Sequence, residues 1–157
     1  MVNARLPTLS HAHQALIHGA GRLFSDTVLL LAARLALAGI FWRSGRTKVD
    51  GWFTLSDSAV ALFAEEYQLP WVEPGQAALL AALAEHALPI LLILGLATRY
   101  ASMGLLVMTL VIQFLVYPDA WPTHLSWLCL QALILARGAG ALSVDAMLSK
   151  RLFRPMQ

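Results

Sequence analysis

The chain has 157 residues, of which 59% are hydrophobic and only 13% are charged, and its mean hydropathy is +0.66. A soluble domain is typically about 45–50% apolar and about 25% charged, so this composition excludes an ordinary soluble domain and indicates an integral membrane protein. The net charge is +2, but the cations flank apolar segments and form no basic face, which argues against nucleic-acid binding. Cys129 is the only cysteine, which excludes an intramolecular disulfide and a two-cysteine redox cycle.

Residues 1–25 are a polar segment that precedes the first apolar stretch. They lack the apolar core of a cleavable signal peptide. The distribution of Lys and Arg, described below, predicts that they form a cytoplasmic N-terminal segment. Three histidines, His11, His13 and His18, are spaced by two and five residues. This spacing does not place all three on one helix face, so no metal site is predicted.

Four apolar segments follow, at about residues 27–43, 76–97, 99–117 and 122–137. A membrane-spanning helix needs about 20 residues, with a range of about 17–25, and these segments are apolar on all sides. The last two links are short, which makes neighbouring helices antiparallel. We therefore predict an all-α fold, an integral membrane four-helix bundle over residues 26–150, followed by a basic tail over residues 151–157.

The link between the first two segments is long, about Ser44 to Gly75, and contains a predicted amphipathic helix within Thr54–Tyr67. Ser56 or Thr54 can cap its start. Its approximate apolar stripe consists of Leu55, Ala59, Leu62, Phe63 and Tyr67. The aromatic residues beside it, Trp52, Phe53 and Trp71, are typical of a membrane interface. We expect this short helix to lie at the membrane surface.

The distribution of Lys and Arg predicts the orientation. With four spans, both termini and the second link share one side, which carries seven cations, against three on the other side. The three are Arg43, Arg46 and Lys48; the seven are Arg5, Arg22, Arg99, Arg137, Lys150, Arg151 and Arg154. The positive-inside rule then places both termini in the cytoplasm.

Each of the four segments carries a polar residue near its middle: Arg34, Glu85, Thr109 and Gln131. A charge at the centre of a membrane helix costs about 2.5–3.5 kcal/mol unless it is paired. Counted at about 1.5 Å per residue from the outer ends, the four groups lie at similar depths. The simplest expectation is an Arg34–Glu85 ion pair, with Pro89 leaving the carbonyl of residue 85 as an acceptor for Arg34 or His86.

Further polar residues lie between this layer and the outer surface. In the fourth segment His124, Trp127 and Gln131 share one face, and Gln113 of the third segment lies at a similar level to His124. Lys48 is close enough in sequence to the outer end to reach them. These residues predict a cleft that suits a head group with carbonyl or anionic oxygens. The structural alternatives are a register-fixing ion pair for Arg34 and Glu85, and packing or interhelical hydrogen bonds for His86, Thr109, Gln113 and Gln131.

The order of several short motifs resembles the DoxX family of small membrane proteins over about residues 28–150. The motifs are Arg34-Leu35, Phe41–Lys48, Leu69-Pro70, Glu85, Leu94–Arg99 and Gly138–Asp145. Arg34, Lys48, Glu85 and Arg99 match positions of the family pattern. The resemblance implies a four-helix, multi-pass protein of the bacterial inner membrane. It also implies redox-linked roles, since the family is named after a subunit of thiosulfate:quinone oxidoreductase.

Three hypotheses of function follow. The first is a redox-linked subunit that binds a quinone or another small polar ligand, with Arg34 as the cation, Glu85 as a proton site or acceptor and Trp127 as a stacking face. Its candidate ligand residues are Arg34, Glu85, Gln131, His124, Trp127, Thr109, Gln113 and Lys48. The second is a non-catalytic membrane anchor or assembly partner for a soluble redox or metal-handling protein. The third is an oligomeric permease for a small solute or metal. We expect a homo-oligomer or a complex subunit, and find no nucleotide or metal motif.

Overall fold

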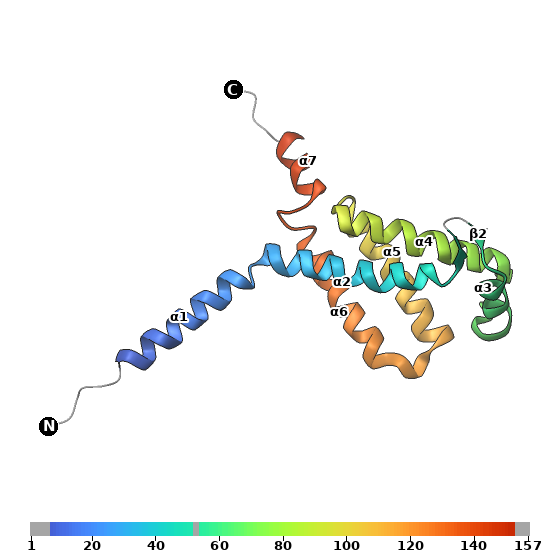
Figure 1. The fold of residues 1–157 in the computed structure, drawn as a ribbon, viewed down its shortest axis with the longest axis horizontal. Helices are drawn as coiled ribbons and strands as arrows, with labels where there is room; N and C mark the ends of the chain where they lie inside the picture. Colours follow the sequence, from blue (N-terminus) through green and yellow to red (C-terminus); the bar gives the residue numbers. More distant parts are fainter. Residues whose placement is uncertain (1–6, 52–53, 153–157) are drawn as a thin grey trace.

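The computed structural model describes residues 7–51 and 54–152, so Trp52 and Phe53, which were expected at the interface, lie outside the described residues. The protein is mostly helical (Figure 1). In the described residues, the longer helices are α1 (Pro7–Leu23), α2 (Asp26–Arg46), α4 (Pro74–Leu94), α5 (Thr98–Val111), α6 (Trp121–Arg137) and α7 (Val144–Leu152). Of these, α2, α4, α5 and α6 pack together, α1 precedes them and α7 follows them. A shorter helix, α3 (Asp57–Leu62), lies in the connection between α2 and α4.

Among the described residues, three helical segments are long and apolar enough to cross a membrane, and they correspond to the first three predicted spans. They are Asp26–Arg46, Pro74–Leu94 and Thr98–Val116, the last formed by α5 and the π-helix η2 (Ile112–Val116). Only 22–39% of each apolar window is buried inside the molecule. Most of each helix therefore faces outward, as expected for helices in contact with lipid. Helix α6 has 17 residues, the lower limit for a span.

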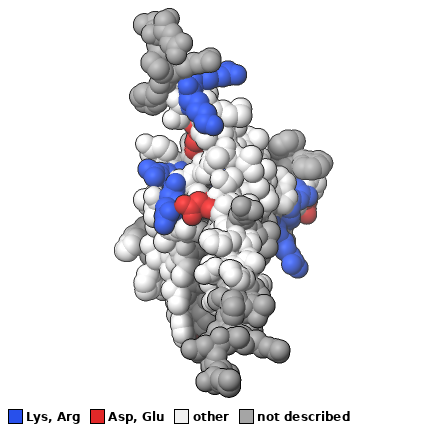
Figure 2. Space-filling view, turned by 90° about the vertical axis from the view of Figure 1, so that its left-hand side faces the viewer, with Lys and Arg blue, Asp and Glu red and all other residues white. Residues whose placement is uncertain are grey.

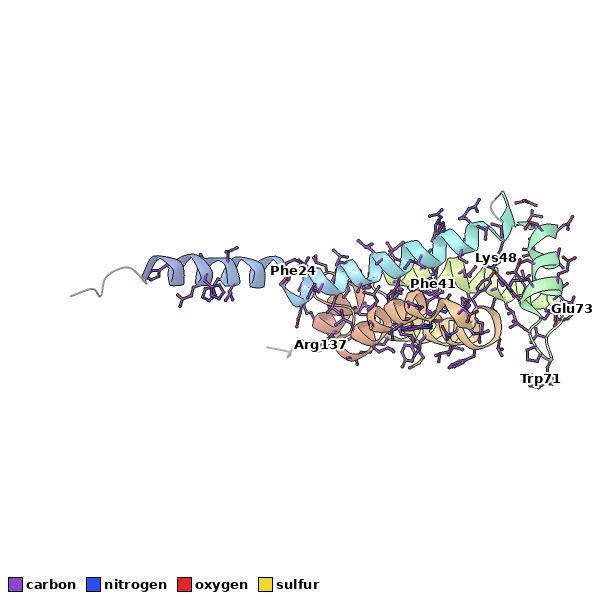
Figure 3. All side chains as sticks on the ribbon, turned by 90° about the horizontal axis from the view of Figure 1, so that it is seen from below. Phe24, Phe41, Lys48, Trp71, Glu73 and Arg137 are labelled. Atoms are coloured by element: carbon purple, nitrogen blue, oxygen red, sulfur yellow. The ribbon has the colours of Figure 1, made fainter. Side chains whose placement is uncertain are left out.

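The long helices pack in pairs around one apolar core. Helix α2 contacts α4 and α6, and α5 also contacts α4 and α6. The core side chains include Leu37, Phe41, Leu92, Leu105 and Ile134. Figure 3 shows Phe24 and Arg137 at one end of the packed helices and Lys48, Trp71 and Glu73 at the other. On the face shown in Figure 2, uncharged side chains cover most of the surface between small groups of charged ones.

The predicted amphipathic helix is present as α3 (Asp57–Leu62), which continues as the π-helix η1 (Phe63–Tyr67). Ser56 caps it, because its Oγ accepts a hydrogen bond from the backbone N–H of Ala59 at 3.2 Å. Phe63 packs against Ala77 and Ala78 in the first turns of α4. This contact positions the connection over one end of the packed helices.

A small antiparallel hairpin before α3 was not predicted. Strand β1 (Val49–Asp50) pairs with β2 (Thr54–Leu55), and Val49 lies opposite Leu55. Two-residue strands are too short to show an alternating pattern. Asp50-Gly51, with Gly51 at a φ of +65°, is a turn dipeptide that could have indicated it.

The opposite end of the packed helices is closed by a capping contact. The Asp145 carboxylate accepts hydrogen bonds from the backbone N–H groups of Ala97 (2.8 Å) and Thr98 (2.9 Å) at the start of α5. The backbone N–H of Asp145 donates to the Gly95 carbonyl at 2.9 Å. Asp145 therefore fastens the start of α7 to the turn between α4 and α5.

Asp145→Asn is expected to remove part of the protein's acid sensitivity. Burial raises the pKa of Asp145, but hydrogen bonds from Thr98 and Ala97 and the charge of Arg34 outweigh it, so the pKa lies below its ordinary value. A lowered carboxyl pKa contributes stability that is present above the unfolded-state value, about 3.9, and is lost as pH falls through the folded-state value. The substitution should cost about 1 kcal/mol at neutral pH and flatten the loss below about pH 4.

Thermal unfolding in detergent across an acid pH series measures this effect. Asp119→Asn, at an exposed position in the Pro118–Ala120 turn, is the matched control. An Asp145→Asn protein that loses stability in acid as steeply as the Asp119→Asn control would contradict the prediction.

Candidate functional site

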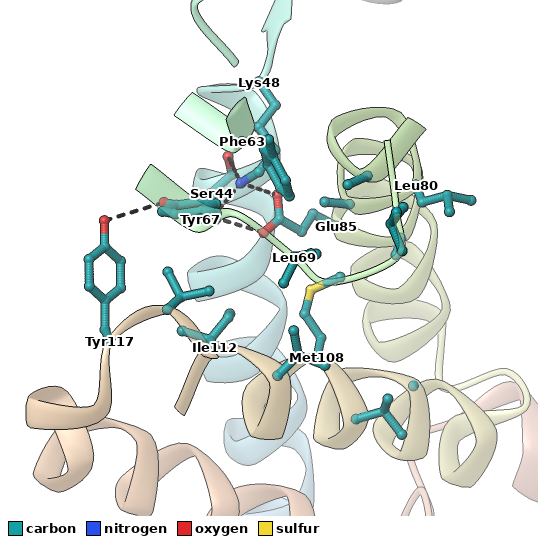
Figure 4. A pocket seen from close by; sticks show the side chains of 18 of the residues that line it. Ser44, Lys48, Phe63, Tyr67, Leu69, Leu80, Glu85, Met108, Ile112 and Tyr117 are labelled. Atoms are coloured by element: carbon teal, nitrogen blue, oxygen red, sulfur yellow. Dashed lines mark hydrogen bonds and ion pairs between the residues drawn. The ribbon is translucent and has the colours of Figure 1, made fainter. Parts of the chain in front are cut away.

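A cavity of about 590 Å³ lies between α4 and α5, beside the ends of α2, η1 and α6 (Figure 4). Its polar lining residues are Ser44, Lys48, Tyr67, Glu85, Tyr117 and His124. The remaining walls are aliphatic or aromatic, with Gly104 among them: Phe63, Leu69, Val72, Ala77, Leu80, Ala81, Ala84, Val107, Met108, Val111, Ile112, Val116 and Trp127. A mostly apolar cavity with a few convergent polar groups is typical of a small-molecule site.

An ion pair between Lys48 and Glu85 forms the polar wall of this cavity. Lys48 Nζ lies 2.7 Å from Glu85 Oε2, and both side chains are buried. The Ser44 hydroxyl donates to Glu85 Oε1 at 2.9 Å, and Lys48 Nζ donates to Ser44 Oγ at 3.1 Å. Figure 4 shows the three side chains converging. Ser44 is in the last turn of α2 and Lys48 is in the turn that follows the helix, four residues later, so both can face Glu85 in the middle of α4.

The expected Arg34–Glu85 ion pair is wrong. Arg34 is buried and donates to four backbone carbonyls. Their oxygens belong to Leu92 (2.8 Å), Ile93 (2.9 Å), Ala139 (2.7 Å) and Leu142 (2.8 Å). Leu92 and Ile93 are in the last turn of α4, where carbonyls lack the usual partner four residues later, and the Leu92 carbonyl also accepts from the Gly95 N–H at 3.2 Å. Arg34 therefore joins the end of α4 to the segment after α6, and it does not donate to the carbonyl of residue 85.

The error came from the assumed alignment of α2 with α4. The depth of Arg34 was counted from Ser44 and the depth of Glu85 from Gln76, which assumes that Ser44 and Gln76 lie at the same height along the helix axes. In the structure Ser44 is level with Glu85, and the turns of α4 before Glu85 continue past the end of α2. Arg34 lies ten residues before Ser44, or about 15 Å along the helix, which is too far from Glu85 for an ion pair.

The polar residues of the third and fourth helices do meet, as their depths predicted. Gln131 Nε2 donates to Thr109 Oγ1 at 2.9 Å, and Thr109 Oγ1 donates to the Leu105 carbonyl at 2.8 Å. Ser102 Oγ donates to the Gln131 carbonyl at 3.3 Å. All three side chains are buried, and none lines the cavity. The structure therefore places Thr109 and Gln131 in interhelical hydrogen bonds.

His124 and Trp127 line the cavity on the side of α6, and their ring centroids are 5.0 Å apart. His124 Nδ1 lies 2.7 Å from Gln113 Oε1, while Gln113 Nε2 donates to the Pro118 carbonyl at 2.8 Å. The carbonyl of Pro118 can only accept, which fixes the orientation of the Gln113 amide. Nδ1 of His124 must then carry a proton, and Nε2 is the acceptor of the neutral ring. Gln113 supports the site from behind and does not line it.

Two tyrosines at the mouth of the cavity were not predicted as site residues. The Tyr117 hydroxyl donates to the Glu66 carboxylate and lies 3.5 Å from the Tyr67 hydroxyl. The bond to Glu66 raises the pKa of Tyr117 above its ordinary value. Tyr67 ends η1 and Tyr117 follows η2, and π-helical turns are not visible in a hydropathy pattern. The position of Tyr67 on the predicted amphipathic stripe was the available signal.

His86 is turned away from the cavity lining. Its Nδ1 lies 2.6 Å from the Ala82 carbonyl, one turn earlier in α4, and its ring packs edge-on against Trp42 at 5.0 Å. These contacts agree with the packing role weighed for His86 from the sequence. Arg99, the other residue that matches the family pattern, donates to the Ala136 carbonyl at 3.3 Å, near the opposite end of the helices.

A family model describes the part of the chain that builds this cavity. The DoxX model matches residues 29–118, more than half of the chain. The chain belongs to the DoxX family. The matched residues of this DoxX protein include every cavity-lining residue except His124 and Trp127. The chain matches no curated protein and no solved structure.

Proposed function

We propose that this DoxX protein is a redox-linked membrane subunit that holds a quinone-like, lipid-soluble ligand in the cavity. In this proposal α6 is a fourth span, the protein lies in the bacterial inner membrane and both termini are cytoplasmic. The observation that carries it is the buried Lys48–Glu85 ion pair, with Ser44 beside it, at one wall of a mostly apolar cavity. A polar head group and an apolar tail would match these two surfaces.

The exposure of the cavity walls supports entry from the lipid. Leu80 of α4 and Val107 of α5 both line the cavity, yet 63% and 55% of their surfaces are exposed. In a membrane, this outward side of α4 and α5 faces the acyl chains. A ligand that partitions into the bilayer can therefore reach the cavity without crossing water.

The polar groups fit both redox states of a quinone. Carbonyl oxygens of the oxidised form can accept from Lys48, and hydroxyls of the reduced form can donate to Glu85 or to Nε2 of His124. Two reduced hydroxyls would thus meet two acceptors that line one cavity. Trp127, beside His124, offers an aromatic face for the ring.

Titration calorimetry of the purified protein with a short-chain benzoquinone and its quinol tests this function. Ala81→Phe places a ring in the cavity and is expected to weaken binding about tenfold or more, a loss of about 1.4 kcal/mol. Leu83→Phe, on the exposed side of the same helix, is the matched control and should bind normally. The proposal fails if the protein binds neither compound, or if both variants bind as the unmodified protein does.

A docking role for the connection between α2 and α4 is a second candidate, supported by Trp71. This side chain is fully exposed next to the cavity mouth, and its φ of +65° is unusual for a bulky residue. A soluble redox protein could use it as an aromatic anchor. Loss of a co-purified partner from Trp71→Ala, with benzoquinone binding intact, would favour this role over ligand binding.

A further inference from the structure

Helix α1 (Pro7–Leu23) has an apolar side in its sequence, and the apolar side chains described on or beside it are exposed. Leu9, Leu16 and Leu23 recur every seven residues, so their positions share one side of the helix. Of the described side chains nearby, Leu16 is 72% exposed, and Ile17 and Phe24 are also exposed. Figure 1 shows α1 extending away from the packed helices. A helix of 17 residues is marginal in water by itself, so its apolar side needs a partner.

The opposite side of α1 is polar, and the helix contains an arginine and no acidic residue. His11, Gln14, His18 and Arg22 fall on this side by helical spacing. Residues 1–25 contain two arginines, three histidines and no aspartate or glutamate. A polar face with arginine and no carboxylate, opposite an apolar face, fits a helix that lies in the plane of an anionic membrane surface.

The connection to α2 places α1 beside the membrane. Helix α2, the first candidate span, begins only two residues after Phe24. Ser25 between them is extended, with φ −60° and ψ 152°, so α1 and α2 are separate helices with a joint at the end of the span. This joint lies at the same end of the molecule as Arg137 (Figure 3). A helix tethered this closely meets lipid head groups before any diffusing partner.

We infer that α1 is an interfacial anchor on the side of the chain termini, with its apolar side buried at the boundary between head groups and acyl chains and its polar side against anionic head groups. A second copy of α1 is a poorer occupant, since 17 residues give fewer than three heptads and the single-signed charges of two copies would repel. The inference is independent of the cavity and of its ligand. It assigns a role to a helix that lies wholly before the family-matched region.

Depth-dependent quenching in the full chain tests this inference. With Cys129 replaced by serine, a single cysteine at Leu16 or at Gln14 carries an environment-sensitive fluorophore. The two positions lie on opposite sides of α1, so each serves as the other's control. In vesicles of phosphatidylcholine with phosphatidylglycerol, the Leu16 label should show blue-shifted emission and quenching by spin-labelled lipid. The Gln14 label should remain in water.

Three outcomes would overturn the inference. The first is a Leu16 label that is as exposed to water as the Gln14 label. The second is equal quenching in vesicles of phosphatidylcholine alone, since anionic lipid would then contribute nothing. The third is a blue shift that grows with the protein-to-lipid ratio without quenching by spin-labelled lipid, which would assign the apolar side to a second copy. Benzoquinone binding by the cavity need not change in any of them.

Discussion

Arg34→Leu is expected to lower the free energy of unfolding by about 4 kcal/mol or more, the largest stability effect that the fold predicts. Its guanidinium supplies donors to four carbonyls, and each buried polar group left unsatisfied costs about 1–3 kcal/mol. Unfolding in mixed micelles with increasing denaturing detergent, followed by circular dichroism, measures the loss. Arg34→Lys should lower the free energy of unfolding by an intermediate amount, because a single ammonium cannot reproduce the planar, forked set of donors of the guanidinium.

Arg137→Leu is the matched control for this loss. The Arg137 guanidinium is exposed and pairs with exposed Asp26 at 2.9 Å, a contact worth about 1 kcal/mol or less. A loss from Arg34→Leu no larger than that from Arg137→Leu would contradict the assigned role of Arg34.

The Arg34→Leu variant also distinguishes the observed contacts of Arg34 from the expected ion pair with Glu85. Arg34 and Glu85 have different partners and lie about 15 Å apart along the helices. The losses from Arg34→Leu and Glu85→Gln should therefore add within about 0.5 kcal/mol. A strong coupling between them would instead support direct pairing.

The surroundings of Gly95 show that the Arg34 guanidinium lies in a tightly packed turn. A Cβ at Gly95 would lie 2.5 Å from Ser143 Cβ and 3.0 Å from Cζ of Arg34, and the residue has a φ of +67°. The turn after α4, the Ser143 segment and the guanidinium thus occupy one tightly packed junction. The junction explains the motifs around Gly95 and Gly138–Asp145 in structural terms, without a ligand.

The sequence predicted helix–helix contacts well where a short link fixes the alignment of the helices. Thr109 and Gln131 were counted from opposite ends of the same turn at Pro118–Pro122, and they are hydrogen-bonded at 2.9 Å. Helix α2 ends at Arg46 and α4 begins only at Pro74, so this long link does not constrain Ser44 and Gln76 to be level. Hydropathy shows that a helix is apolar and says little about its axial position relative to a neighbour.

The candidate site was only partly predictable for the same reason. Glu85, Lys48, His124 and Trp127 line one cavity, whereas Arg34, Thr109, Gln113 and Gln131 hold the helices together. Polar residues in a membrane helix look alike in sequence whether they face a cavity or a backbone carbonyl. The choice depends on rotation and axial shift, which packing decides.

A double-mutant cycle on Lys48 and Glu85 is expected to show a coupling of about 2 kcal/mol or more. Removing one member of a buried ion pair typically costs about 3–5 kcal/mol because the other charge remains buried. Lys48→Met and Glu85→Gln should each be destabilising, and the double variant should lose much less than the sum. Ser44→Ala, which removes one neutral donor and keeps both charges, should cost only about 1 kcal/mol.

Ligand binding by the double variant then decides between a structural and a functional ion pair. Lys48→Met with Glu85→Gln keeps the cavity close to its size but removes both charges from its wall. If the pair only fixes the position of α2 against α4, the stable double variant should bind a short-chain benzoquinone as the unmodified protein does. If the charges hold the head group, binding should fall while folding is retained, because the lost contacts belong to the ligand and not to the packing of the helices.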